Sequence, residues 1–159
     1  MTFRFWHRWL LVVSVASTLL GLVIAIFPDS ILFAPHTAGI EEVFFDGAMP
    51  ESANELRTFL FALLGGTIAG YFLMQTLIVW GPFYRREPWA WHAVLWALLI
   101  WFVTDSTLST IHGALFNVWM VNLWTLFLVG LPLVMTRREF TRSSVHGPDE
   151  ADVGAQNAS

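Results

Sequence analysis

The stretch Trp101–Asn122, WFVTDSTLSTIHGALFNVWMVN, decides the fold, because it continues apolar sequence on both sides and contains one strong helix breaker, Gly113. It is also the only place where a carboxylate, a histidine and two asparagines lie within otherwise lipid-compatible sequence. Placing an ionisable side chain in a membrane span is costly, so such a residue is usually paired or functional. The stretch therefore predicts two apolar helices that turn near Gly113 and carry a polar cluster.

The composition is that of an integral membrane protein. Hydrophobic residues make up 56% of the 159 residues, and nine Trp and fourteen Phe are far more than a soluble domain of this size carries. The mean hydropathy is +0.61. The lack of cysteine excludes disulfides, thiolate metal sites and thiol catalysis, so any metal would need histidine and carboxylate ligands. With no lysine and a net charge of −4, the chain has no basic surface for nucleic acid.

Four apolar runs are long enough to cross a hydrocarbon core of about 30 Å, which requires about 20 helical residues. They predict an all-α integral membrane protein with four transmembrane helices in a domain at 1–142. Asp105 is the only acid within these runs. The small, polar segment 143–159 is predicted to be a disordered cytoplasmic tail. The spans are placed near residues 9–27, 57–80, 89–111 and 114–135.

The arginines predict the orientation. Seven of the eight lie at one end of the spans, and only Arg57 lies at the other. Because positive residues gather in cytoplasmic loops, this distribution predicts cytoplasmic N- and C-termini and an up-down-up-down bundle. We expect a plasma membrane, specifically a bacterial or archaeal inner membrane. The seven arginines are Arg4, Arg8, Arg85, Arg86, Arg137, Arg138 and Arg142.

The loop at 28–56 lies outside in this arrangement, and its length favours a structure of its own. Ile40, Val43 and Phe44 recur at helical spacing among acidic residues, which predicts a short amphipathic helix on the outer surface. His36 and the loop acids could offer ligands to a cation. No recognised ligand spacing is present, so we interpret them as a solvated acidic surface and predict no metal site.

Small residues mark faces where membrane helices approach closely. Gly66 and Gly70 form a GxxxG pair on the second span, which predicts close backbone contact within the bundle or between protomers. Gln75 and His92 fall at similar depth on the second and third spans and are expected to share a hydrogen bond. His7, among arginines, is expected to be a solvated interfacial histidine. The small residues of the first span are Ser14, Ser17, Thr18 and Gly21.

The polar residues beside the turn form the candidate site. At about 100° per residue, Asp105, Ser109 and His112 share one stripe of the third span. By the same count, Asn117 and Asn122 of the fourth span point about 140° apart. One of these asparagines is therefore expected to face the first or second helix. The pattern favours a distributed polar network in the outer half of the bundle.

Two functions are compatible with this network. In the favoured one, Arg57, the only cation at the outer end, pairs with Asp105 and fixes the helix register. The chain is then a non-catalytic accessory or scaffold protein that self-associates or belongs to a larger membrane complex. Its surroundings are the lipid bilayer, and no nucleic acid is expected as a partner.

The alternative is a binding protein or enzyme for an apolar small molecule or lipid. Its pocket would open toward the outer loop, with aromatic walls from Trp101 and Trp119. A metal site built from His36, the loop acids and His112 ranks last. The sequence contains no recognised catalytic signature and no internal repeat, and it identifies no cofactor. The candidate residues for the polar cluster or pocket are Arg57, Asp105, Ser109, His112, Asn117 and Asn122.

Overall fold

The computed structural model describes residues 2–143, and all regular structure within this range is helical. Of the tail predicted to be disordered, residues 144–159 lie outside the described range, whereas Ser143 still belongs to a helix. The α-helices are α1 (Phe3–Ile26), α2 (Ala34–Phe44), α3 (Glu51–Ile78), α4 (Pro88–Ile111), α5 (Leu115–Asn117) and α6 (Leu123–Ser143). The other helical turns are the 3₁₀ turn η1 (Ile31–Phe33) and the π turns η2 (Val79–Phe83) and η3 (Val118–Asn122).

Four helical segments are long and apolar enough to span a membrane, and each overlaps one of the predicted apolar runs. This part of the sequence prediction is confirmed. At about 1.5 Å of rise per residue, each segment exceeds the length of a hydrocarbon core of about 30 Å. The four segments are Phe3–Ile26, Glu51–Phe83, Pro88–Ile111 and Leu115–Thr141.

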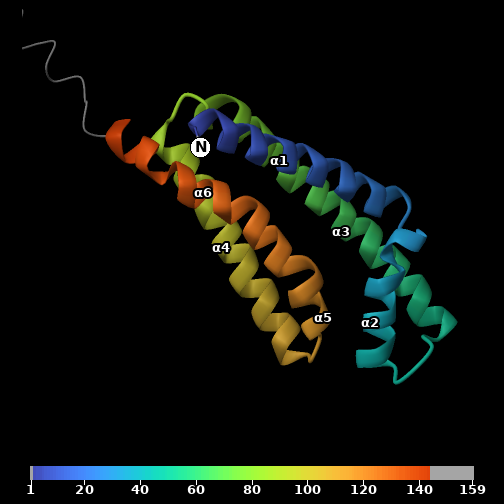
Figure 1. Cartoon of the computed structure of the whole chain (residues 1–159). Helices are drawn as coiled ribbons and strands as arrows, with labels where there is room; N and C mark the ends of the chain where they lie inside the picture. Colours follow the sequence, from blue (N-terminus) through green and yellow to red (C-terminus); the bar gives the residue numbers. More distant parts are fainter. Residues whose placement is uncertain (1, 144–159) are drawn as a thin grey trace, which may run out of the picture.

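The spans form two helix pairs, α1 with α3 and α4 with α6 (Figure 1). The pairs meet at the end that holds the N-terminus and separate toward the end that holds α2. A core of buried apolar side chains from α1, η2, α4 and α6 joins the two pairs. Its members include Leu10, Val79, Phe83, Val94, Leu133 and Phe140.

Glycines without a side chain let α1 and α3 pack closely. A Cβ atom on Gly21 would lie 2.5 Å from the amide nitrogen of Ala69, and one on Gly65 would meet the backbone of α1. Gly66 and Gly70, the predicted pair, have no atom within 4 Å of a Cβ position and are exposed. Of the two predicted alternatives, contact within the bundle is therefore not observed for this pair, and contact between protomers stays a prediction. The contact within the bundle instead uses Gly21 of the predicted stripe and Gly65, one residue before the predicted pair.

His7 is buried, with 7% of its surface exposed, so its expected position in solvent is wrong. Its Nε2–H donates to the carbonyl oxygen of Val79 at 3.0 Å. Pro82 lacks an N–H group, and the chain forms the π turn η2 around it instead of a regular α-helix. The imidazole thus satisfies a carbonyl group in an irregular part of the neighbouring span.

Gln75 bonds to α1 rather than to α4. Its Nε2 donates to the hydroxyl of Ser14 at 2.9 Å, and that hydroxyl donates to the carbonyl of Leu10 at 2.8 Å. His92 Nδ1–H donates to the carbonyl of Pro88 in its own helix at 2.8 Å. The expected hydrogen bond between Gln75 and His92 is wrong, because equal depth does not determine which neighbour a side chain faces.

Two tryptophans connect α6 to the other spans. Pro132 has no N–H group, which leaves the carbonyl of Leu128, four residues earlier, without its helical partner. Trp9 Nε1–H of α1 donates to this carbonyl at 3.0 Å. Trp91 Nε1–H of α4 donates to the carbonyl of Leu133 at 2.9 Å. Side chains of both helix pairs thereby satisfy backbone groups of α6 near its proline.

The predicted short helix of the outer loop is present as α2. Its apolar residues Val43 and Phe44 are exposed, whereas a Cβ atom on Gly39 would lie 2.7 Å from the ring of Phe116. The helix therefore approaches Phe116 closely at a glycine, while two of its apolar side chains stay exposed. In Figure 1 it lies between α3 and α5, at the end where the helix pairs separate.

Candidate functional site

A cavity of about 470 Å³ lies between the two helix pairs, bordered by η1 and α2 at one end. Small-molecule sites commonly have volumes of about 300–1,000 Å³. The walls are mainly apolar, and Phe61 and Tyr71 of α3 and Trp101 of α4 supply aromatic rings. Trp101 is a predicted wall residue. Trp119, the other one, is 66% exposed and does not line the cavity.

Among residues 2–143, Asp105 is the only Asp, Glu, Lys or Arg in the lining of this cavity. Its Oδ2 accepts hydrogen bonds from the side-chain amides of Asn117, at 2.8 Å, and Asn122, at 2.7 Å. Its other oxygen, Oδ1, has no hydrogen-bond donor among residues 2–143. Two amide donors replace part of the hydration that the carboxylate loses, which reduces the cost of burying it.

Both asparagines reach Asp105 because the helix between them is not a regular α-helix. Regular geometry would separate Asn117 and Asn122 by about 140°. The π turn η3 holds one additional residue within a turn. That residue takes up about 100° of rotation, which returns the two side chains to within roughly 40° of one another. The expectation that one asparagine faces another helix is wrong for this reason.

Two serines of α4 complete the amide hydrogen bonding. Asn117 Nδ2 also donates to Ser109 Oγ at 2.9 Å, and Asn122 Nδ2 also donates to Ser106 Oγ at 3.0 Å. Each amide thus uses both of its hydrogens. Sequence reasoning misses Ser106, which lies about 100° from Asp105 on the helix and off the predicted stripe. Its one sequence cue is a short polar side chain directly after the acid.

His36 of α2 also belongs to the cluster, through Asn117. Its Nε2–H donates to Asn117 Oδ1 at 3.3 Å, and its ring packs edge-on against Phe61 and Phe116 at centroid distances of 5.3 and 5.1 Å. Its Nδ1 is buried and has no partner within the described residues. Burial lowers the pKa of His36 below its ordinary value of 6.5, because it disfavours the charged imidazolium. The interpretation of His36 as part of a solvated surface is therefore wrong.

Arg57 does not pair with Asp105. Its Nη2 lies 2.6 Å from Oδ1 of Asp29 in the outer loop, and its Nη1 donates to the hydroxyl of Thr37 in α2 at 3.4 Å. Only 9% of the Arg57 side chain is exposed. The predicted Arg57–Asp105 pair is wrong, because the guanidinium near the start of α3 binds Thr37 and Asp29 instead. Arg57 thus fastens the loop and α2 to α3.

His112 ends α4 at the turn, where it is exposed and lies outside both the cluster and the cavity lining. Within residues 2–143, no group of three or more histidines and acids is arranged to hold a metal ion. Of the six candidates, Arg57 and His112 thus stand apart. The structure brings together Asp105, Ser109, Asn117 and Asn122, and it adds Ser106 and His36.

No protein-family model, curated protein or solved structure matches the chain. Helix bundles of this kind carry many different functions, so the fold alone assigns none of them. What this chain can bind therefore depends on the cavity and on the polar cluster beside α2.

Proposed function

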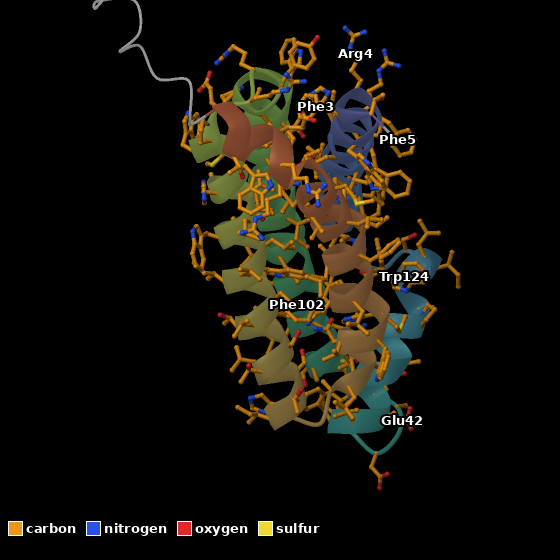
Figure 2. All side chains as sticks on the ribbon, turned by 60° about the vertical axis from the view of Figure 1, so that its left-hand side comes forward. Phe3, Arg4, Phe5, Glu42, Phe102 and Trp124 are labelled. Carbon is orange, nitrogen blue, oxygen red and sulfur yellow. The ribbon has the colours of Figure 1, made fainter. Side chains whose placement is uncertain are left out.

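We propose that the chain crosses a plasma membrane four times, with successive spans in opposite directions and both termini in the cytoplasm. The charge distribution supports this topology. Arg86 lies 3.4 Å from Glu139, so the segment after η2 and the last turns of α6 lie together at the end that holds the N-terminus. Figure 2 shows Arg4 and Glu42 at opposite ends of the molecule. Positive residues favour the cytoplasmic side of a membrane, so α2 lies on the outer side.

We propose further that the protein binds an apolar small molecule or a lipid between its two helix pairs. One observation carries this proposal: a mainly apolar cavity between the four candidate spans, with the polar cluster around Asp105 at one end. An empty apolar cavity forfeits dispersion contacts on every wall, and a bound apolar body restores them. The cluster around Asp105 would orient the polar end of the ligand.

The cluster supports binding more directly than catalysis. The hydroxyl groups of Ser106 and Ser109 accept hydrogen bonds from the asparagine amides, and neither donates to a carboxylate or to a histidine. An activated serine nucleophile needs such a base within hydrogen-bond reach. The arrangement therefore holds Asp105 in place without preparing a nucleophile.

Native mass spectrometry of the protein extracted in a mild detergent tests the proposal. The wild type should retain a small molecule or lipid of defined mass. Ile68→Trp, which fills the cavity from α3, should lose it, whereas Leu63→Trp on the outward face of the same helix should keep it. A wild-type protein without any bound molecule, or equal retention by both variants, would contradict the proposal.

A second candidate function is a non-catalytic accessory or scaffold role, as a self-associating protein or a subunit of a membrane complex. It is favoured by the exposed face of Gly66 and Gly70, where another helix could approach closely. The same mass spectra give the oligomeric state. A homo-oligomer or complex that Gly66→Leu dissociates would support this role, and a monomeric wild type would exclude self-association through that face.

A further inference from the structure

At the polar end of the cavity, the asparagine amides already donate both of their hydrogens, whereas some acceptor atoms have no donor among the described residues. Both amide hydrogens of Asn117 and of Asn122 are donated to Asp105 and to serines. Asp105 Oδ1 has no donor among the described residues. His36, another residue of the lining, has a buried Nδ1 without a partner among the described residues. With its Nε2 protonated, His36 presents an acceptor at Nδ1. The hydroxyl groups of Ser106 and Ser109 do not line the cavity, so a ligand that bonds to this end supplies the donors.

The charge at this end is also unbalanced. Asp105 is the only charged side chain that the described residues contribute to the lining, and Arg57, the cation of the outer end, is engaged with Asp29. In the described part of the chain, no Lys or Arg forms an ion pair with Asp105. A carboxylate removed from water is favoured by an opposite charge nearby. The complementary group is a cation supplied by the ligand.

The walls suit a cation that carries an apolar body. Tyr71 and Trp101 place aromatic rings along the cavity, and the faces of such rings attract ammonium groups. The ring of Phe61 already has the guanidinium of Arg57 at 5.5 Å from its centroid. The remaining lining is largely aliphatic and can hold an alkyl chain or a ring system. The cavity thus combines one negative charge, aromatic rings and an apolar volume.

We propose that the ligand is a lipophilic amine, whose protonated ammonium group is bound by Asp105 and whose apolar body fills the space between the helix pairs. This inference rests on the proposed binding function and adds the chemical class of the ligand. The headgroup of an ethanolamine lipid offers the same ammonium group. Its phosphate, however, would meet the Asp105 carboxylate, and the guanidinium of Arg57 is already occupied by Asp29. A free amine therefore fits better.

Isothermal titration calorimetry on the full-length protein in phosphatidylcholine nanodiscs tests this choice. The probes are dodecylamine, 1-dodecanol and dodecanoate, which share one chain length, and titrations of empty nanodiscs correct for partition into lipid. The wild type should bind dodecylamine about tenfold or more tightly than 1-dodecanol, as a charge-assisted hydrogen bond predicts. Dodecanoate should bind most weakly, because its carboxylate faces that of Asp105.

Two variants that each remove one negative charge show whether the preference for the amine arises at Asp105. Asp105→Asn retains an oxygen that can accept from both asparagines, and it should lower dodecylamine affinity about tenfold while leaving 1-dodecanol affinity within about twofold. Glu42→Gln removes an exposed acid of α2 and should change neither affinity. Lysophosphatidylethanolamine, which adds a phosphate to the same ammonium group, should bind more weakly than dodecylamine.

The outcomes separate this inference from the proposed function. Equal wild-type affinity for dodecylamine and 1-dodecanol would overturn the amine but leave an apolar binding site intact. Lysophosphatidylethanolamine binding as tight as that of dodecylamine would overturn the free amine in favour of a lipid headgroup. Binding of none of the probes would overturn both proposals. The comparison between probes uses wild-type protein, so it remains decisive even if Asp105→Asn fails to fold.

Discussion

Asp105 is held in the third span by two amide donors of the following helix, Asn117 and Asn122, which approach the same carboxylate oxygen. A lone carboxylate in a membrane span is costly, and neutral donors reduce that cost without cancelling the charge. The second carboxylate oxygen remains available at the cavity. At this scale, one side chain serves both the packing of α4 against η3 and the proposed recognition of a ligand.

Substitutions at Asp105 should distinguish loss of charge from loss of the acceptor. Asp105→Asn keeps an oxygen for both asparagine amides, so the free energy of unfolding should change little. Asp105→Ala leaves these buried donors unpaired and should cost about 1–3 kcal/mol. Thermal unfolding in detergent measures both variants. Equal losses would show that the charge, and not the hydrogen bonding, stabilises the cluster.

His36 should make the docking of α2 depend on pH. Its pKa in the folded protein is below 6.5, so a conformation in which α2 is released takes up a proton at higher pH than the folded state. The stabilisation is therefore present above pH about 6.5 and is lost as the pH falls below it. Hydrogen exchange of α2, measured relative to α1, should increase on acidification.

The control for this prediction is His36→Gln, which keeps an amide donor but does not titrate in this range. Its α2 exchange should show little dependence on pH beyond the intrinsic chemistry of exchange. Wild-type exchange that is equally independent of pH would contradict the assigned role of His36.

At the scale of elements, the π turn η3 shows where sequence reasoning succeeds and where it ends. Apolar runs are a local property, so they predict the four spans, and counting from the turn at Gly113 brings Asp105 and Asn122 to similar depth. Nothing local in the sequence announces a π turn, so the facing of the two asparagines is predicted wrongly. The partners of His36 and Arg57 depend on where α2 packs, which is a tertiary property.

Deletion of one residue should be tolerated inside the π turn η3 but not in the adjoining helix α6. Removing Trp119 turns η3 into regular α-helix and keeps Asn117 and Asn122 on one face, so stability should stay within about 1 kcal/mol of wild type. Removing Phe127, an exposed residue of α6, rotates the helix on one side of it by about 100° and should cost more than about 4 kcal/mol. Unfolding measurements that rank the two deletions equally would contradict the role of η3.

The contact between α1 and α3 provides a second test at this scale. Gly65→Ala places a methyl group against the backbone of α1 and should cost about 1–3 kcal/mol through overpacking. Gly66→Ala makes the same change in helix propensity at a position with open space, and should be neutral or slightly stabilising. If both variants unfold alike, the helices do not approach as closely as the structure shows.

At the scale of the whole molecule, the two helix pairs are joined firmly at one end and are bridged by smaller contacts at the other. The buried core, the Arg86–Glu139 ion pair and the tryptophan hydrogen bonds gather toward the end with the N-terminus. The other end depends on α2, which Arg57 and His36 connect to the bundle. Access to the cavity should therefore be controlled at the α2 end, which is the outer side in the proposed topology.

The orientation can be tested cleanly because the chain has no cysteine. A single cysteine at the exposed position Glu42 should react with a membrane-impermeant maleimide added to whole cells, since α2 lies outside in the proposed topology. A cysteine at Arg138, exposed at the other end, should react only after the cells are opened. The reverse pattern would invert the proposed orientation and place the cavity mouth on the cytoplasmic side.

The central claim is that the space between the helix pairs is a ligand site. An experimental structure of the protein purified from its own membrane, with no ligand added, tests it most directly. The account predicts elongated density between the pairs that ends at Asp105 Oδ1, beneath His36, with α2 closed over it. Helix pairs that meet along their full length, or an empty cavity with Asp105 bonded only to asparagine, would contradict the claim.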